Sequence, residues 1–289
     1  MRAADVAAAS DDAPAPPPPL VPGVARALSP LVRRIVAPNP GKMTGAGTNT
    51  YLVGIDEIAV IDPGPADDEH LDAVTGCGGD RIRWIVCTHT HPDHSPGAAA
   101  LKEATGAEVL AYGSRDGLKV DGRLRQGDRI EATEFRLTTH ETPGHSSNHL
   151  CFLLEEERML FSGDTVLDGT TSAVSPPGGD MAAYLDSLAA LRQLRLKSIA
   201  PGHGHLIEDP KARIDFYIEH RLEREEQIRR ALAEAGTAKI DVLVAEIYPD
   251  LDPDLVAPAR RTVHAHLLKL AAEGKVSGKT AAGNWSIAA

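Results

Sequence analysis

The sequence is short of cysteine, of aromatic side chains and of positive charge, and each shortage excludes a class of protein. Its three cysteines, Cys77, Cys87 and Cys151, are too few for a disulfide framework, which favours a reducing, cytoplasmic location. Aromatic residues make up 4% of the chain, so an extended base-stacking surface is excluded. Because 30 Lys and Arg face 41 Asp and Glu, the net charge of -11 opposes bulk attraction to nucleic acids or anionic membranes.

Long apolar runs are also missing. No stretch approaches the roughly 18 apolar residues of a membrane span, so no membrane partner is expected. Hydrophobic residues at 42% and charged residues at 25% are ordinary for a globular protein, which excludes disorder of the whole chain. The length of 289 residues suits one large domain, or one domain with a small appendage.

The first 28 residues form an Ala/Pro-rich segment with four consecutive prolines at 16–19. It has too little bulky apolar content to pack, so residues 1–28 are predicted to be a disordered or polyproline arm. A secretory signal peptide is the competing interpretation. It fails because Asp5, Asp11 and Asp12 interrupt any apolar core of such a signal.

Two regions of different secondary structure follow, with a boundary near residue 210. Residues 29–210 are predicted to form the main domain, with short strands at 50–54, 58–62, 83–87, 108–112, 135–139, 149–154, 159–161 and 198–200. Residues 211–289 predict a long charged helix over 211–234, helices over 240–247 and 255–273, and a hairpin over 275–287. The order of three helices and a hairpin is that of a winged-helix module.

Four ligand-type residues, His89, His91, Asp93 and His94, lie within six positions directly after the strand predicted at 83–87. Pro92 blocks a helix here, and a loop at a strand end can aim several side chains at one point. Imidazole and carboxylate together suit zinc, iron or manganese. One histidine alone is usually a surface or core residue, but four ligand types at this spacing indicate a metal site.

Three more candidate ligands follow later strands, and these are His145, Asp164 and His203. Each comes directly after a glycine, which lets the backbone approach closely. Five histidines and two aspartates are too many for one tetrahedral ion, and they fit two ions that share a bridge.

This pattern resembles the metallo-β-lactamase-fold superfamily, whose motif order matches the HxHxDH run at 89–94 and the three later residues. The resemblance covers about residues 30 to 210. It implies an α+β fold, an αββα sandwich with the metals at one edge of its two sheets. It also implies two zinc ions per chain, with iron or manganese as alternatives.

The resemblance implies a role for each ligand. One metal would take His89, His91 and His145, and the other would take Asp93, His94 and His203. Asp164 would bridge the two metals together with a hydroxide. The metals would make hydroxide available at neutral pH. Asp93 is the candidate catalytic residue, but its ligand role ranks first because a metal-bound carboxylate has little basicity.

The C-terminal region resembles the winged-helix domain of one branch of that superfamily, as do residues 45–51 and 217–224. That branch includes lactamase-β-like endoribonucleases, which makes single-stranded RNA the alternative substrate. From His220 onward, ten Lys and Arg balance ten Asp and Glu, so the tail has no net formal charge. A winged helix without a basic surface is more often a packing or dimerisation element, so a homodimer is one candidate assembly.

The favoured function is therefore metal-dependent hydrolysis of an acyl (thio)ester or a similar small molecule. β-Lactam hydrolysis is disfavoured, since the commonest dizinc β-lactamases have cysteine where Asp164 stands. A non-catalytic metal-binding protein is disfavoured because all seven ligands are intact.

Several further residues have both a functional and a purely structural interpretation. Asp62 is either a turn carboxylate or a hydrogen-bond partner of a ligand histidine. His149 and His205 either contact substrate or act behind the ligands, while His140, Cys87 and Cys151 are predicted to be structural. The loop at 166–180 is a candidate wall of the substrate pocket, and Asp168 would make its entrance acidic.

Overall fold

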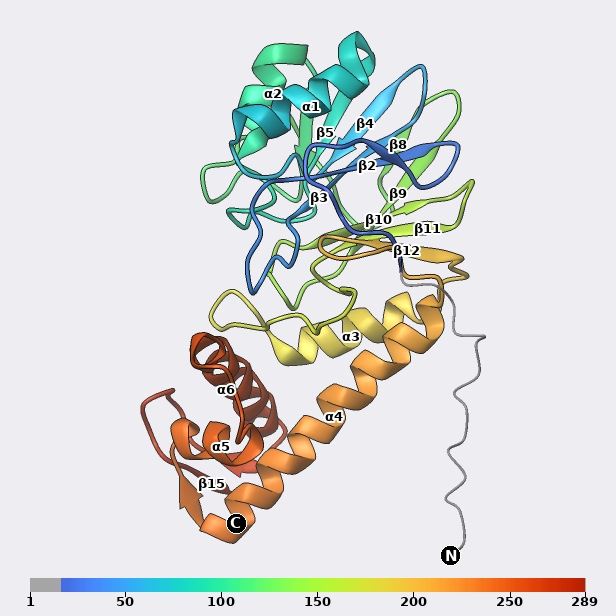
Figure 1. Cartoon of the computed structure of the whole chain (residues 1–289). Coiled ribbons are helices and arrows are strands. Elements are labelled where there is room, and N and C mark those ends of the chain that lie inside the picture. Colours follow the sequence, from blue (N-terminus) through green and yellow to red (C-terminus); the bar gives the residue numbers. More distant parts are fainter. Residues whose placement is uncertain (1–16, 289) are drawn as a thin grey trace, which may run out of the picture.

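The computed structural model describes residues 17–288, which form a sandwich of two sheets followed by a smaller C-terminal part (Figure 1). The first sheet runs in chain order through β1 (Arg26–Ala27), β2 (Val32–Val36), β3 (Asn49–Val53), β4 (Ile58–Ile61), β5 (Ile82–Val86), β6 (Glu108–Ala111) and β7 (Gly122–Arg123). Strands β1 to β4 pair antiparallel, and β4 to β7 pair parallel.

The second sheet has the order β12-β11-β10-β9-β8. Its strands are β8 (Arg129–Glu131), β9 (Arg136–Glu141), β10 (Leu150–Leu154), β11 (Met159–Gly163) and β12 (Ser198–Pro201). The inner faces of the two sheets meet in one apolar core, in which Phe135, Phe152 and Phe161 are fully buried. Strands β3, β4 and β11 are buried along their whole length, as expected for strands covered on both faces.

Helices cover the outer face of each sheet and complete the αββα order. Helices α1 (Asp68–Gly78) and α2 (Gly97–Thr105) pack on the first sheet, with η1 (Gly79–Arg81) after α1. Helices α3 (Met181–Leu191) and α4 (Pro210–Ala235) pack on the second. Asp67, Asp180 and Asp209 cap the N-termini of α1, α3 and α4 by accepting a backbone N–H, which sets where each helix begins.

The C-terminal part is built on the second half of α4, as Figure 1 shows. It contains α5 (Ile240–Ile247), η2 (Pro253–Leu255), α6 (Val256–Ala272) and a small sheet with the order β13 (Thr237–Ala238), β15 (Trp285–Ile287), β14 (Val276–Ser277). Its own core holds Leu232, Leu243 and Trp285. This is the winged-helix domain predicted from the order of elements. Buried Glu225 of α4 contacts His266 Nδ1 at 3.3 Å and Lys269 Nζ at 2.9 Å, which ties α6 to α4.

The predicted N-terminal arm differs in part from the structure. Residues 1–16 lie outside the described residues. Residues 22–28 are paired rather than disordered, because Gly23 N–H bonds to Val36 O and Arg26–Ala27 form β1 against β2. The edge of β2 offers unpaired backbone groups, and this segment takes them up. Over residues 17–288, no helix is both long and apolar enough to cross a membrane.

Candidate metal centre

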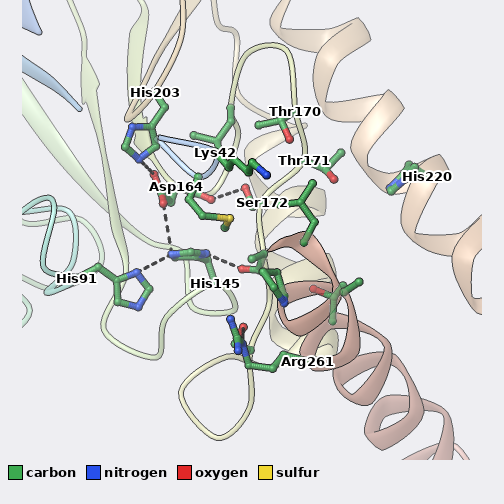
Figure 2. Close-up of a pocket in the computed structure, with 18 of the residues that line it drawn as sticks. Lys42, His91, His145, Asp164, Thr170, Thr171, Ser172, His203, His220 and Arg261 are labelled. Carbon is green, nitrogen blue, oxygen red and sulfur yellow. Dashed lines mark hydrogen bonds and ion pairs between the residues drawn. The ribbon is translucent and has the colours of Figure 1, made fainter. Parts of the chain in front are cut away.

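The seven predicted ligands come together at one edge of the sandwich, from four loops that follow β5, β9, β11 and β12. Figure 2 shows His91, His145, Asp164 and His203 turned toward one cavity. The four strands belong to two different sheets, so only the packing of the sheets brings these loops into contact.

A first group contains His89, His91, His145 and Asp164. His91 Nδ1 lies 3.0 Å from His89 Nε2 and 2.9 Å from His145 Nε2. His145 Nε2 is 3.5 Å from Asp164 Oδ2. One ligand atom from each residue lies within 4.8 Å of the others, which is the spacing needed to surround a single ion.

A second group contains Asp93, His94 and His203. Asp93 Oδ2 lies 3.4 Å from His94 Nε2 and 3.2 Å from His203 Nε2. Asp164 reaches this group as well, because its Oδ1 is 3.3 Å from His94 Nε2 and 3.4 Å from His203 Nε2. The two oxygens of Asp164 therefore face different groups, which is the placement of a bridging carboxylate.

The outer ring nitrogens of four of these histidines are held by acceptors behind them. The pairs are His89 Nδ1 with Thr88 Oγ1 (3.0 Å), His94 Nδ1 with Asp62 Oδ2 (2.9 Å), His145 Nδ1 with Ala173 O (2.7 Å) and His203 Nδ1 with Gly47 O (3.3 Å). A hydrogen bond of this kind fixes the ring and leaves the inner nitrogen free, which is typical of metal-binding histidines.

Asp62 is a hydrogen-bond partner of His94, a candidate ligand, which agrees with one of its two predicted interpretations. Its buried carboxylate accepts from the N–H and hydroxyl of Thr88, both at 2.7 Å, and from His94 Nδ1. Its backbone has a φ of 51°, a strained value for a residue with a side chain. The turn after β4 thus aims the carboxylate under the HxHxDH loop.

His149 lies behind the ligands and is 1% exposed, so it has no surface to offer a substrate. Its Nε2 accepts from the backbone N–H of Asp164 at 3.1 Å, and its Nδ1 lies near the hydroxyls of Thr142 and Thr165. His149 therefore positions the bridging residue through the backbone.

His205 and Asp168 form a separate contact. The His205 N–H donates to Asp168 Oδ2 at 3.0 Å, which steadies the turn that carries His203. The carboxylate of Asp168 is thus used in the turn and does not line the cleft, which corrects the prediction of an acidic entrance. Cys87 and Cys151 are fully buried, as predicted.

Burial keeps most of the ligand histidines neutral. Burial, assisted by neighbouring histidines, holds the pKa of His89 well below its ordinary value. Burial is also the main reason why the pKa of His91 falls to about 4 and why that of His145 is lowered. A neutral imidazole has a free lone pair, which is the form that binds metal.

His94 behaves differently because carboxylates surround it. Burial lowers its pKa, but Asp164, Asp62 and Asp93 outweigh that effect and raise the pKa well above its usual value. Burial opposes the ionisation of Asp93 and Asp164, yet His94 and His203 hold the pKa of both carboxyls well below the ordinary range. The negative charge of these buried carboxylates favours the binding of a cation between them.

In the described part of the chain, the site also has buried nitrogen and oxygen atoms that no hydrogen bond satisfies. Among residues 17–288, the buried atoms His94 Nε2 and Asp164 Oδ1 have no hydrogen-bond partner. Such atoms are costly to bury unless something binds them. A Cβ at Gly202 would lie 2.6 Å from Asp164 Oδ1, so only glycine fits before His203. The residues present therefore fit a divalent metal of the kind that takes nitrogen and oxygen ligands.

The cluster opens into a cleft of about 530 Å³ between the sandwich and the winged-helix domain. The loop at 166–180 supplies part of its wall, as predicted, through Leu167, residues 170–173, Ser175 and Gly178. Lys42, Arg261 and Tyr248 also line it and were not found from the sequence. The first precedes every motif and the other two lie in the tail, so nothing local marks them.

Comparison with known proteins gives matches along most of the chain. The profile of the Metallo-beta-lactamase superfamily matches residues 43–203, and that of the Beta-lactamase associated winged helix domain matches residues 240–285. The Beta-lactamase-like protein 2 homolog of Drosophila melanogaster is 32% identical over 277 residues, covering 89% of this chain and 93% of that protein. The Atrochrysone carboxyl ACP thioesterase of Aspergillus chevalieri is 33% identical over 278 residues, covering 90% and 86%.

Two solved structures share the fold along almost the whole chain. A Beta-lactamase domain protein from Burkholderia ambifaria superposes with a TM-score of 0.79 at 21% identity, over 93% of this chain and 95% of that one. A metallo-beta-lactamase family protein from Thermus thermophilus superposes with a TM-score of 0.76 at 22% identity, over 90% and 100%. At such identities the likeness concerns the fold alone.

Proposed function

The chain belongs to the metallo-beta-lactamase superfamily and is a hydrolase of that fold, and from this premise we propose that it hydrolyses acyl thioesters with two zinc ions. The observation that supports hydrolytic activity is the cluster of seven candidate ligand residues, which opens into a cleft. The thioester part is supported by the relative in Aspergillus chevalieri, which is named as a thioesterase.

We assign the ligands as the two groups of side chains suggest. His89, His91 and His145 would hold one ion, Asp93, His94 and His203 would hold the other, and Asp164 would serve both. The domain boundaries that we propose are 29–210 for the catalytic domain and 211–289 for the long helix with the winged helix.

When bound, zinc supplies Lewis acidity, which lowers the pKa of water to about 7 and polarises a carbonyl. The protein's own groups orient the reactants. Asp93 has the most accessible carboxylate of the cluster, with 27% of its side chain exposed against 12% for Asp164. It is a ligand first, and it also accepts a hydrogen bond from the attacking water and so holds that water toward the thioester.

The distribution of charge argues against single-stranded RNA as the substrate. An RNA-binding winged helix needs an open basic face for phosphates. Here Arg260 pairs with Asp241 at 2.7 Å, Lys269 with Glu225 at 2.9 Å and Lys275 with Glu273 at 2.8 Å. Carboxylates already neutralise these three cations, and Leu251, Leu255, Pro258 and Ala259 make up part of the cleft wall on this side.

A substrate panel tests the proposal directly. Zinc-reconstituted protein is assayed side by side on acyl N-acetylcysteamine thioesters, lactones, a phosphodiester, a β-lactam and single-stranded RNA. We expect the highest kcat/KM on the thioesters and none without metal. Faster hydrolysis of the phosphodiester or the RNA would refute the thioesterase and favour the nuclease.

A further inference from the structure

The wall of the cleft that lies across from the ligands is made by the winged-helix domain. Tyr248, Leu251 and Leu255 line this cleft from the segment between α5 and α6, and all three are half-buried. Met43 and Leu167 line it from the sandwich. These five side chains, which we call the apolar wall, line the same cleft as His91, Asp93 and three further candidate ligands.

The two sides of the cleft thus differ in chemistry. Histidines and carboxylates lie on one side, and Leu251, Leu255, Pro258 and Ala259 lie on the other, beside the polar side chains of Arg261 and Thr262. A ligand that satisfies both has a polar reacting group at one end and an apolar body at the other. The volume of about 530 Å³ is within the range of cavities that enclose a drug-sized molecule, so it exceeds what an acetyl group needs.

Side-chain contacts join the winged-helix domain to the loops that carry the candidate ligands. These contacts hold the apolar wall at a fixed distance from the ligand cluster. The segment at 38–48 begins and ends in the sandwich, and its Gly47 carbonyl accepts from His203 Nδ1. From the same segment, Lys42 Nζ contacts Asp252 Oδ1 at 2.8 Å and Asp254 Oδ2 at 2.5 Å, directly before Leu255. On the other flank, buried Arg221 donates to Ser172 O and lies over the Tyr184 ring.

We propose that the apolar wall is the acyl-binding site and that it selects long or aromatic acyl groups over acetyl. This inference rests on the proposed thioesterase function and adds the substrate class. It assigns the winged-helix domain a part in substrate recognition, whereas the tail's neutral charge alone suggests packing or dimerisation. A ligand that covers half-buried leucines in a cavity binds more tightly, because apolar surface is removed from water.

The test compares two neighbouring residues of the holoenzyme. Leu255→Ala removes apolar surface from the wall, whereas Val256→Ala is the matched control, since Val256 is 37% exposed and does not line the cleft. The substrates are acetyl, hexanoyl, decanoyl and benzoyl N-acetylcysteamine thioesters. In the wild type we expect kcat/KM to rise from acetyl to decanoyl. Leu255→Ala should lower kcat/KM about tenfold on the decanoyl thioester, mainly by raising KM, and should change kcat/KM little on the acetyl thioester.

A binding measurement keeps the inference separate from the catalytic proposal. The S-ethyl and S-decyl thioethers of N-acetylcysteamine cannot be hydrolysed, and their affinities for the zinc-loaded protein can be measured by calorimetry. We expect the decyl compound to bind more tightly, and Leu255→Ala, but not Val256→Ala, to remove that advantage.

The two failures are distinguishable. If the wild type hydrolyses no thioester but binds decyl over ethyl through Leu255, the thioesterase proposal falls and the apolar subsite stands. If wild-type rates and affinities do not depend on chain length, or if both alanine variants change them equally, the acyl-binding site is wrong. Thermal unfolding of both variants shows whether a lost preference reflects lost folding.

Discussion

Replacement of Asp62 by asparagine is expected to weaken one of the two metal sites and leave the other. The carboxylate accepts from Thr88 N–H through Oδ1, and from Thr88 Oγ1 and His94 Nδ1 through Oδ2. Because an ionised carboxylate only accepts, His94 keeps a proton on Nδ1. Its Nε2 is then the nitrogen that can release its proton and offer a lone pair to a cation beside Asp93 and Asp164.

Asparagine reverses the last of these contacts. If the asparagine oxygen keeps the bond to Thr88 N–H, the amide nitrogen takes the place of Oδ2 and points an N–H donor at His94 Nδ1. The imidazole then moves its proton to Nε2, or the ring turns, and in either case the lone pair is lost from the cluster. Losses of such supporting contacts cost about 10- to 100-fold in metal affinity, which equals about 1.4 to 2.8 kcal/mol.

Competitive titration of the apoprotein with zinc, against a chromophoric chelator, measures the two affinities separately. Asp209→Asn is the matched control, because it makes the same change of charge at the cap of α4, where asparagine serves as well as aspartate. We expect the control to match the wild type at both sites. If Asp62→Asn also binds both ions with wild-type affinity while folded, His94 is not a ligand through Nε2.

Three further outcomes are expected. Metal analysis after gentle purification should find close to two first-row ions per chain, and folded protein that takes up no zinc would contradict the dinuclear site. Asp164→Ala should remove more activity than His205→Ala, since the first removes the carboxylate that reaches both groups of ligands and the second keeps the backbone N–H that bonds to Asp168. Equal losses would mean a wrong ligand assignment. Burial lowers the pKa of His266 to about 4, so its share of stability is complete above about pH 6.5 and is lost as the pH falls toward 4. Between pH 7.5 and 5.0 this amounts to about 2 kcal/mol. Chemical unfolding should therefore find that the wild type loses about 2 kcal/mol more over this range than His266→Gln, since the other buried histidines contribute equally to both proteins.

The candidate ligands could be found from the sequence because each has a local signal. The HxHxDH run places four ligands in six residues, and a glycine directly before each of the other three marks a close approach of backbone. The structure explains the glycines: a Cβ at Gly144 would lie 2.3 Å from the Tyr184 Cα, and one at Gly163 would lie 2.6 Å from Thr88 Oγ1.

The supporting contacts were not predictable in the same way. Asp62 meets His94 across 32 residues of sequence, and His149 meets the Asp164 N–H across 15. A carboxylate at the end of a strand occurs in many turns, so the sequence leaves its partner open. The partner is decided by the parallel pairing of β4 with β5, which brings the two strand ends together.

The sequence by itself determined the strands and helices and the order of the winged helix through hydrophobic periodicity, and the ligand candidates through short motifs. The family and the four-layer sandwich followed from the resemblance that those motifs carry. Only the tertiary structure decided what the ligands face. Lys42, Leu167 and Tyr248 are separated by 80 residues or more, and they line one cleft because α4 carries the winged helix back over the edge of the sandwich. The lining of such a cleft has no local pattern in the sequence. Each residue contributes a single side chain to it, and the packing of the two domains creates the space between them.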